Sequence, residues 1–175
     1  GEGLPPPDIT GITHWHWDHT FGMHRTIGVS IAHRATNILL HREREKLADS
    51  VYGEFLKTDD VHLGREYADG RDIVAVPADI GYDTRLTLDL GGVTAELFHA
   101  VSPHSEDTTL VFVPEEKVLF LGDATSEDFY NNGYMDKKKL HSLTRLIENT
   151  DCGYCLVSHA QPLTKAELLH YLRSL

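Results

Sequence analysis

The chain has 175 residues, of which 41% are hydrophobic and 25% are charged, as in ordinary folded proteins, and its length predicts a single domain over residues 1–175. Its formal net charge of −11 disfavours non-specific binding to nucleic acid, because an acidic surface repels phosphate groups. No apolar run approaches the roughly 20 residues that span a bilayer and no signal peptide is visible, so we expect a small-molecule substrate and neither nucleic acid nor a membrane as a partner.

The first half of the chain predicts short elements around a polar cluster. Residues 8–13 are β-prone and end abruptly at histidines, residues 20–26 favour a brief helix, and residues 29–32 favour a strand. Apolar spacing predicts a helix over residues 35–51. Residues 52–83 are polar and mixed in pattern, and this segment is a candidate for covering a binding cleft.

The second half has clearer patterns. Alternation and apolar runs predict strands over residues 85–90, 93–99, 108–113, 118–121 and 155–158. Gly91 and Gly92 indicate a hairpin turn, and the apolar spacing of residues 136–149 indicates an amphipathic helix. Thr164 and Glu167 indicate a capping box at the start of a final helix. Interspersed strands and helices without a repeated βαβ period favour a layered α/β or α+β fold.

Two cysteines, Cys152 and Cys155, form a single C-x-x-C pair that continues into an apolar strand. One pair cannot supply four ligands to a structural zinc ion, and a thioredoxin-like motif would precede a helix. We therefore expect buried, reduced thiols, which fit a cytoplasmic location.

The densest functional signal is His14-Trp-His16-Trp-Asp18-His19. Alternate side chains of an extended segment point the same way, so His14 and His16 can bind one ion, and Asp18 and His19 can reach a second ion once the chain bends. Imidazole and carboxylate groups suit zinc, and also iron or manganese. The alternative is a solvated polar loop, which the two interleaved tryptophans disfavour.

Further ligands are expected where later strands end. His104 lies in a loop between two strands, Asp123 directly follows the apolar strand 118–121, and His159 directly follows the strand 155–158. Taken singly, each could be a turn or surface residue, but together they complete a metal site. The other histidines lack ligand context, and we expect structural or surface roles for His24, His33, His41, His62, His99, His141 and His170.

These motifs resemble those of the metallo-β-lactamase superfamily. The chain matches H-x-H-x-D-H in full, and His104, Gly122-Asp123 and Ser158-His159 follow in the expected order. The resemblance implies an αββα sandwich with two metal ions. It also implies a first metal held by His14, His16 and His104, a second held by Asp18, His19 and His159, and Asp123 bridging them.

Two features depart from the family's pattern. The residues around the third histidine, Pro103-His104-Ser105-Glu106-Asp107, lack the family's usual glycines, which affects the shape of the loop. Only about a dozen residues precede the histidine motif, so the resemblance predicts a fold that is incomplete at the N-terminus. Because an open sheet edge favours pairing, we expect a homo-oligomer or association with a missing N-terminal segment.

The chemistry implied is metal-dependent hydrolysis. Two zinc ions, or iron or manganese, would activate a bridging hydroxide, with Asp18 or Asp123 orienting it, against an ester, thioester, lactone or lactam. One alternative is a mononuclear iron dioxygenase of the same fold, and another is an inactive, truncated metal-binding domain. Diiron relatives resemble H-x-E-x-D-H, and His16 stands where they carry glutamate.

Overall fold

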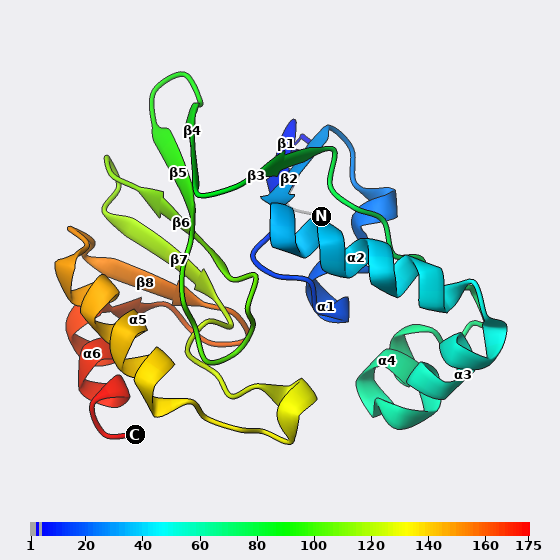
Figure 1. The fold of residues 1–175 in the computed structure, drawn as a ribbon. Helices are drawn as coiled ribbons and strands as arrows, with labels where there is room; N and C mark the ends of the chain where they lie inside the picture. Colours follow the sequence, from blue (N-terminus) through cyan, green and yellow to red (C-terminus); the bar gives the residue numbers. More distant parts are fainter. Residues whose placement is uncertain (1–2, 4) are drawn as a thin grey trace. The chain divides into compact units, whose positions relative to one another are not determined.

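The computed structural model describes residue 3 and residues 5–175. It divides into two compact units, Gly1–Gly81 and Tyr82–Leu175, which are described separately. Each unit holds one sheet with helices beside it, so the mixed α/β class predicted from the sequence is confirmed (Figure 1). The single domain over residues 1–175 stays a prediction.

The first unit is built on a sheet of three short strands in the order β1-β2-β3. These strands are β1 (Ile9–Gly11), β2 (Val29–His33) and β3 (Ile80–Tyr82), and β1 runs parallel to β2. Between β1 and β2 the chain forms helix α1 (Trp17–Thr20) and the 3-10 helix η1 (Met23–Arg25). The brief helix predicted over residues 20–26 is therefore two shorter turns that begin earlier, inside the histidine motif.

Helix α2 (Arg34–Leu47) begins directly after β2, where the ring of His33 accepts a hydrogen bond from the backbone N–H of Ala35. The single helix predicted over residues 35–51 ends at Leu47, and Asp49 then caps a new helix, α3 (Ser50–Asp59). The carboxylate of Asp60 caps a third, α4 (Val61–Glu66). The segment that the sequence left unassigned thus begins as a helical hairpin.

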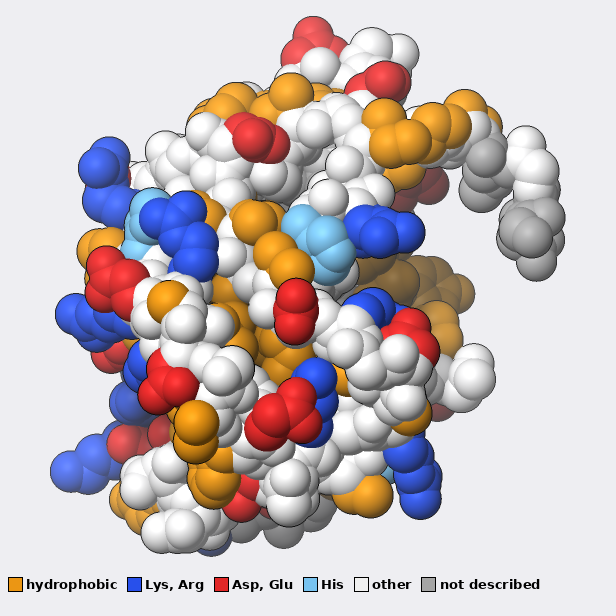
Figure 2. All heavy atoms as spheres, turned by 90° about the vertical axis from the view of Figure 1, so that its right-hand side faces the viewer, with side chains coloured by type: hydrophobic (Ala, Val, Ile, Leu, Met, Phe, Trp, Pro, Cys, Tyr) orange, Lys and Arg blue, Asp and Glu red, His pale blue; other side chains and the backbone are white. Residues whose placement is uncertain are grey.

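Gly64 lets α3 and α4 approach closely. A Cβ atom at this position would lie 2.3 Å from the carbonyl oxygen of Lys57, a distance that no side chain tolerates. Acidic, basic and hydrophobic side chains are interspersed on the face that carries these helices (Figure 2). Across residue 3 and residues 5–175, no helix combines the length and apolar character needed to cross a membrane.

The second unit is built on a six-stranded sheet in the order β4-β5-β6-β7-β8-β9. Its strands are β4 (Arg85–Asp89), β5 (Thr94–His99), β6 (Thr109–Val113), β7 (Val118–Gly122), β8 (Tyr154–Val157) and β9 (Leu163–Thr164). All neighbours are antiparallel except β7 and β8, which run parallel. Gly91 and Gly92 adopt φ values of 76° and 143° in the β4–β5 turn, which explains the glycine pair.

Helices α5 (Lys137–Asn149) and α6 (Lys165–Leu172) lie side by side against this sheet (Figure 1). Their apolar residues form one buried cluster with residues of β6, β7 and β8, including Leu110, Leu119, Leu121, Leu140, Leu143, Ile147 and Leu168. Cys152 and Cys155 belong to the same cluster and are free, with their Sγ atoms 3.9 Å apart. Both thiols are thus buried and free, as expected, and burial raises the pKa of the Cys155 thiol to about 12.

The predicted capping box at α6 is present and gives a stability test. The Thr164 side chain accepts a hydrogen bond from the Glu167 N–H, and the Glu167 carboxylate accepts one from the Thr164 N–H at 2.8 Å. Thr164→Ala is expected to lower the free energy of unfolding by about 1 kcal/mol, measured by denaturant titration. Thr58→Ala, at an exposed position near the end of α3, is the control and should change it by less than about 0.5 kcal/mol. Equal effects of the two substitutions would contradict the capping role.

Candidate metal centre

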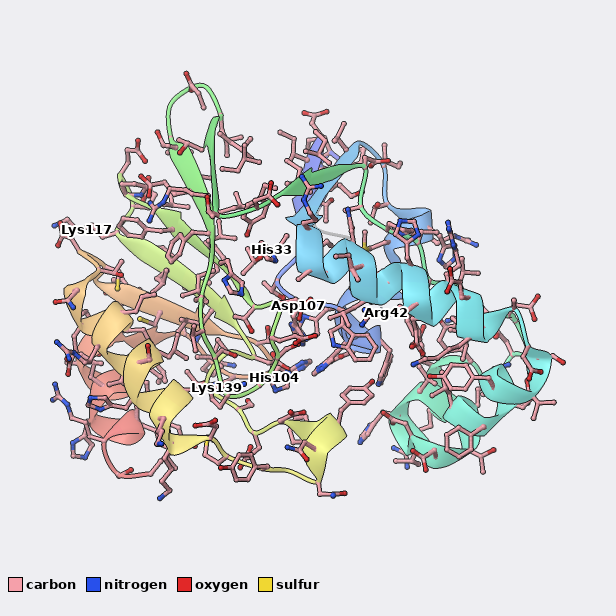
Figure 3. All side chains as sticks on the ribbon, viewed as in Figure 1. His33, Arg42, His104, Asp107, Lys117 and Lys139 are labelled. Atoms are coloured by element: carbon pink, nitrogen blue, oxygen red, sulfur yellow. The ribbon has the colours of Figure 1, made fainter. Side chains whose placement is uncertain are left out.

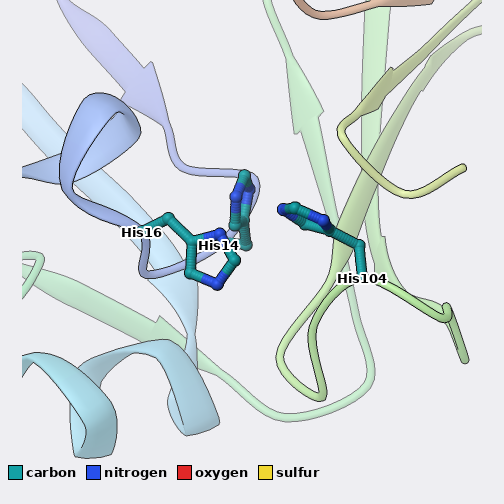
Figure 4. Close-up of side chains that lie close together, drawn as sticks. All are labelled: His14, His16 and His104. Carbon is teal, nitrogen blue, oxygen red and sulfur yellow. The ribbon is translucent and has the colours of Figure 1, made fainter. Parts of the chain in front are cut away.

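The histidine motif of the first unit leaves β1 as an extended segment and bends into α1. His14 and His16 are 1% and 5% exposed, and their ring centroids lie 4.5 Å apart. The ring of His19 lies 4.1 Å from that of His14, and its Nε2 atom lies 3.4 Å from Oδ2 of Asp18. Four ligand-capable side chains of the predicted site therefore gather within this unit (Figure 4 shows His14 and His16).

The backbone of this motif is held in shape by neighbouring groups. The Thr20 hydroxyl contacts two carbonyl oxygens of the motif, those of Trp15 at 2.8 Å and His16 at 2.9 Å. The indole N–H of Trp17 donates to the carboxylate of Asp60 at 2.8 Å, which ties the motif to the start of α4. These contacts give the histidines fixed directions, as ligand binding requires.

His104 has a defined tautomer. It is 1% exposed on the loop after β5, and its Nδ1 atom lies 2.7 Å from the carbonyl oxygen of Glu127 (Figures 3 and 4). A carbonyl can only accept, so Nδ1 carries the proton, as it does in many histidines that bind a metal through Nε2. That Nε2 atom lies 3.8 Å from Oδ2 of Asp123, beyond hydrogen-bond distance.

Asp123 and His159 meet because of the sheet topology. They follow β7 and β8, which are parallel neighbours, and so both lie at the carboxyl edge of the sheet. Asp123 is 8% exposed, and its Oδ2 lies 3.6 Å from Nε2 of His159. His159 has a φ of 59°, a left-handed conformation that is rare outside glycine and concentrates at functional sites.

These distances suit metal ligands better than hydrogen bonds. Two ligand atoms bound at about 2.0–2.1 Å to a tetrahedral zinc ion lie about 3.4 Å apart. The separations of Asp18 from His19 and of Asp123 from His159, 3.4 and 3.6 Å, are close to that value. The donor set of imidazoles and carboxylates fits divalent metal ions.

The predicted departure around His104 has a structural explanation. The position where the family usually has its second glycine holds Asp107, which is fully buried and accepts a hydrogen bond from the Ser105 hydroxyl. Ser102 supplies further contacts to the backbone N–H groups of His104 and Ser105. Figure 3 shows His104 and Asp107 on this loop, whereas Lys117 lies at the opposite end of the sheet. Side-chain hydrogen bonds thus shape a loop that glycines usually shape.

Comparison with known proteins gives the family. Residues 1–148 match the metallo-beta-lactamase superfamily. The chain belongs to this superfamily. Its histidine and aspartate clusters fit a metal-dependent hydrolase.

Solved structures of the superfamily share the fold. A metallo-beta-lactamase from Pontibacter korlensis has a TM-score of 0.64 and 22% identity, covering 96% of this chain and 68% of its own. An archaeal superfamily protein from Sulfolobus tokodaii has a TM-score of 0.63 and 19% identity, covering 98% and 68%. A variant of the sec-alkyl sulfatase PisA1 has a TM-score of 0.65 and 13% identity, covering 98% and 32%. A search of curated proteins gave no match.

Sequence reasoning missed the groups that orient the ligands. Asp60, the Glu127 carbonyl and Thr13 are absent from the predicted site, although Thr13 lies 3.1 Å from Nδ1 of His14. A backbone carbonyl carries no residue signature, and Asp60 is 43 residues from Trp17. Only Thr13, directly before the first histidine, could have been found from the sequence.

Proposed function

We propose that this protein is a hydrolase with two metal ions, most suitably zinc, bridged by Asp123. The observation that carries the proposal is the position of the Asp123 carboxylate. One oxygen, Oδ2, lies 3.8 Å from Nε2 of His104 and 3.6 Å from Nε2 of His159. A single buried carboxylate oxygen that faces two imidazole nitrogens suits a bridge between two ions.

The remaining ligands are assigned to the two ions as the family resemblance implies. His14, His16 and His104 would hold the first ion, and Asp18, His19 and His159 the second. The proposal is supported by the clustering of the four motif residues within the first unit and of the other three within the second. It is also supported by the hydrogen bond from Nδ1 of His104 to the Glu127 carbonyl, which fixes the direction of this ring.

Metal ions held by these residues would lower the pKa of a water ligand to about 7, far below that of bulk water, and would polarise the bond to be cleaved. The two aspartates of the proposed site differ in their exposure to solvent. Asp18 has a side chain that is 30% exposed, against 10% for Asp123, so Asp18 is the carboxylate that can accept a hydrogen bond from an incoming water.

The proposed substrates are esters, thioesters, lactones or lactams. Structural neighbours include a metallo-beta-lactamase and a sec-alkyl sulfatase, both of which are named for cleaving a bond to a heteroatom. The protein is proposed to act on a small molecule in the cytoplasm, as a homo-oligomer.

Elemental analysis combined with turnover tests the proposal. We expect two equivalents of zinc per chain after dialysis, and hydrolysis of an aryl ester or a thioester that a chelator abolishes and added zinc restores. One equivalent of iron with oxygen uptake would instead indicate the dioxygenase alternative. Two zinc equivalents without turnover on esters, thioesters, lactones or lactams would indicate an inactive metal-binding domain.

His16→Ala is expected to lower the metal content by about one equivalent, because it removes a buried imidazole from a three-histidine set. The measurement is metal content per folded chain, with folding checked by circular dichroism. His41→Ala is the matched control, since His41 is exposed on α2 and contacts Arg44. Unchanged metal content in His16→Ala would remove this residue from the ligand set.

A further inference from the structure

Beside the histidine motif, the first unit contains a cavity of about 590 Å³ that the metal ligands do not account for. Its walls come from α1, the turn after it, η1, and the end of α4 with the residues that follow. Cavities of roughly 300–1,000 Å³ are typical of small-molecule sites. Asp18 is part of the wall, so the cavity adjoins the proposed metal centre.

The inner wall of the cavity is aromatic. Phe21 and Tyr67 are 3% and 5% exposed and belong to one buried cluster, with Trp17 packed against it. The hydrogen bond from Trp17 to Asp60 fixes the indole. Rigid aromatic faces bind flat apolar groups at low cost in conformational entropy.

The two arginines of the wall differ in their ion pairs. Arg71 donates to both Glu66 and Asp69 and lies 4.6 Å from the ring centroid of Tyr67, so this guanidinium and these two carboxylates satisfy one another. Arg25, in η1, forms no ion pair with any carboxylate of the described residues. Arg25 is therefore the available donor for a ligand.

A single available guanidinium suits a single negative charge. A phosphate dianion would normally recruit more than one cation, and the carboxylate of Asp18 in the same wall would repel a dianion more strongly than a monoanion. A carboxylate can bind Arg25 through two parallel hydrogen bonds. The cavity thus offers an aromatic wall for a flat group and one cation for a carboxylate.

We propose that this cavity holds the non-reacting part of the substrate, a planar apolar group that bears a carboxylate, with Arg25 binding the carboxylate and Trp17 and Tyr67 contacting the planar group. This arrangement places the reacting bond toward Asp18, and in that respect the proposal rests on the proposed hydrolase function. The binding of the planar carboxylate does not depend on turnover and can be measured by itself.

Gly22 gives a way to fill the cavity without straining the backbone. It lines the cavity, a Cβ atom there would meet no atom within 4 Å, and its φ of −82° and ψ of −9° are accessible to any residue. Gly22→Leu should therefore occupy the space that a ligand needs, while Gly22→Ala should leave most of it open.

The test measures the dissociation constants of 3-phenylpropionate and its neutral analogue 3-phenylpropionamide, followed through the indole N–H resonance of Trp17. It is performed on the zinc-loaded protein and again after chelation, because a carboxylate could also bind the metal. We expect the carboxylate to bind about fivefold more tightly than the amide in both states. Arg25→Gln should remove this preference, and Arg42→Gln, at an exposed arginine on α2, should keep it.

We further expect Gly22→Leu to raise the dissociation constants of both probes at least about tenfold. Gly22→Ala should leave them near the wild-type values. Carboxylate binding that needs the metal and is unaffected by Arg25→Gln would overturn the proposal, as would equal binding in Gly22→Leu and the wild type. If the probes bind as expected but no ester, thioester, lactone or lactam is hydrolysed, the assignment of the cavity as a site for a planar carboxylate stands and the hydrolase proposal fails. If esters are hydrolysed but neither probe binds, the hydrolase proposal stands and the cavity assignment fails.

Discussion

Replacing Asp123 with asparagine is expected to lower kcat/KM for an ester or thioester at least about a thousandfold, equivalent to about 4 kcal/mol of transition-state stabilisation. Asparagine has nearly the same shape, but it loses the negative charge that faces His104 and His159 at 3.8 and 3.6 Å. An amide cannot bridge two cations as a carboxylate does, so the metal content should fall as well. Steady-state kinetics and elemental analysis on the same preparation measure both effects.

Asp151→Asn is the matched control for this substitution. Asp151 has a side chain that is 87% exposed and pairs only with Lys117, so the same chemical change there should leave kcat/KM and metal content within twofold. An Asp123→Asn protein that kept both metal ions and normal turnover would refute the bridging role.

The sequence singled out these candidate ligands because they lie where regular elements end. Asp123 follows a continuous apolar strand and His159 follows another, and the structure places both ends at one edge because β7 and β8 are parallel. The alternation of the later strands and the Thr164–Glu167 capping box were also predictable, since each depends on residues close in sequence. The assignment of all seven residues as metal ligands stays a proposal.

The helical region was less predictable because local signals conflict. Val51 continues the apolar spacing of α2 and suggested a helix through residue 51, yet Val51 is 72% exposed and adds little burial. Asp49 instead ends the run, because its carboxylate accepts a hydrogen bond from the Val51 N–H and caps α3. An N-cap carboxylate was thus a stronger signal here than apolar periodicity.

The supporting contacts were beyond sequence reasoning for a different reason. Trp17 reaches Asp60 across 43 residues, and His104 is oriented by a backbone carbonyl, that of Glu127. Neither contact leaves a periodic or local pattern. The cavity beside Asp18 was equally hidden, because its wall joins residues 17–25 to residues 66–71, whose fold the pattern left unassigned.

Removing the metal is expected to destabilise the protein strongly. Ions that bind only the folded state contribute about 4 kcal/mol when their free concentration is a thousand times the dissociation constant. For a chain of this length that corresponds to a fall in Tm of roughly 10 °C on chelation. Thermal unfolding followed by circular dichroism, in zinc and in chelator, gives the difference directly.

Two variants separate a ligand effect from a general loss of stability. Asp123→Asn should lose most of the difference in Tm between zinc and chelator, because the bridging carboxylate contributes to both proposed ions. Ile147→Val, at a fully buried position of α5, should lower Tm in both conditions through a loss of about 1 kcal/mol of packing, and should keep the difference intact. If chelation leaves the wild-type Tm unchanged, or if Ile147→Val removes the difference as completely as Asp123→Asn does, then metal binding is not coupled to folding through this carboxylate.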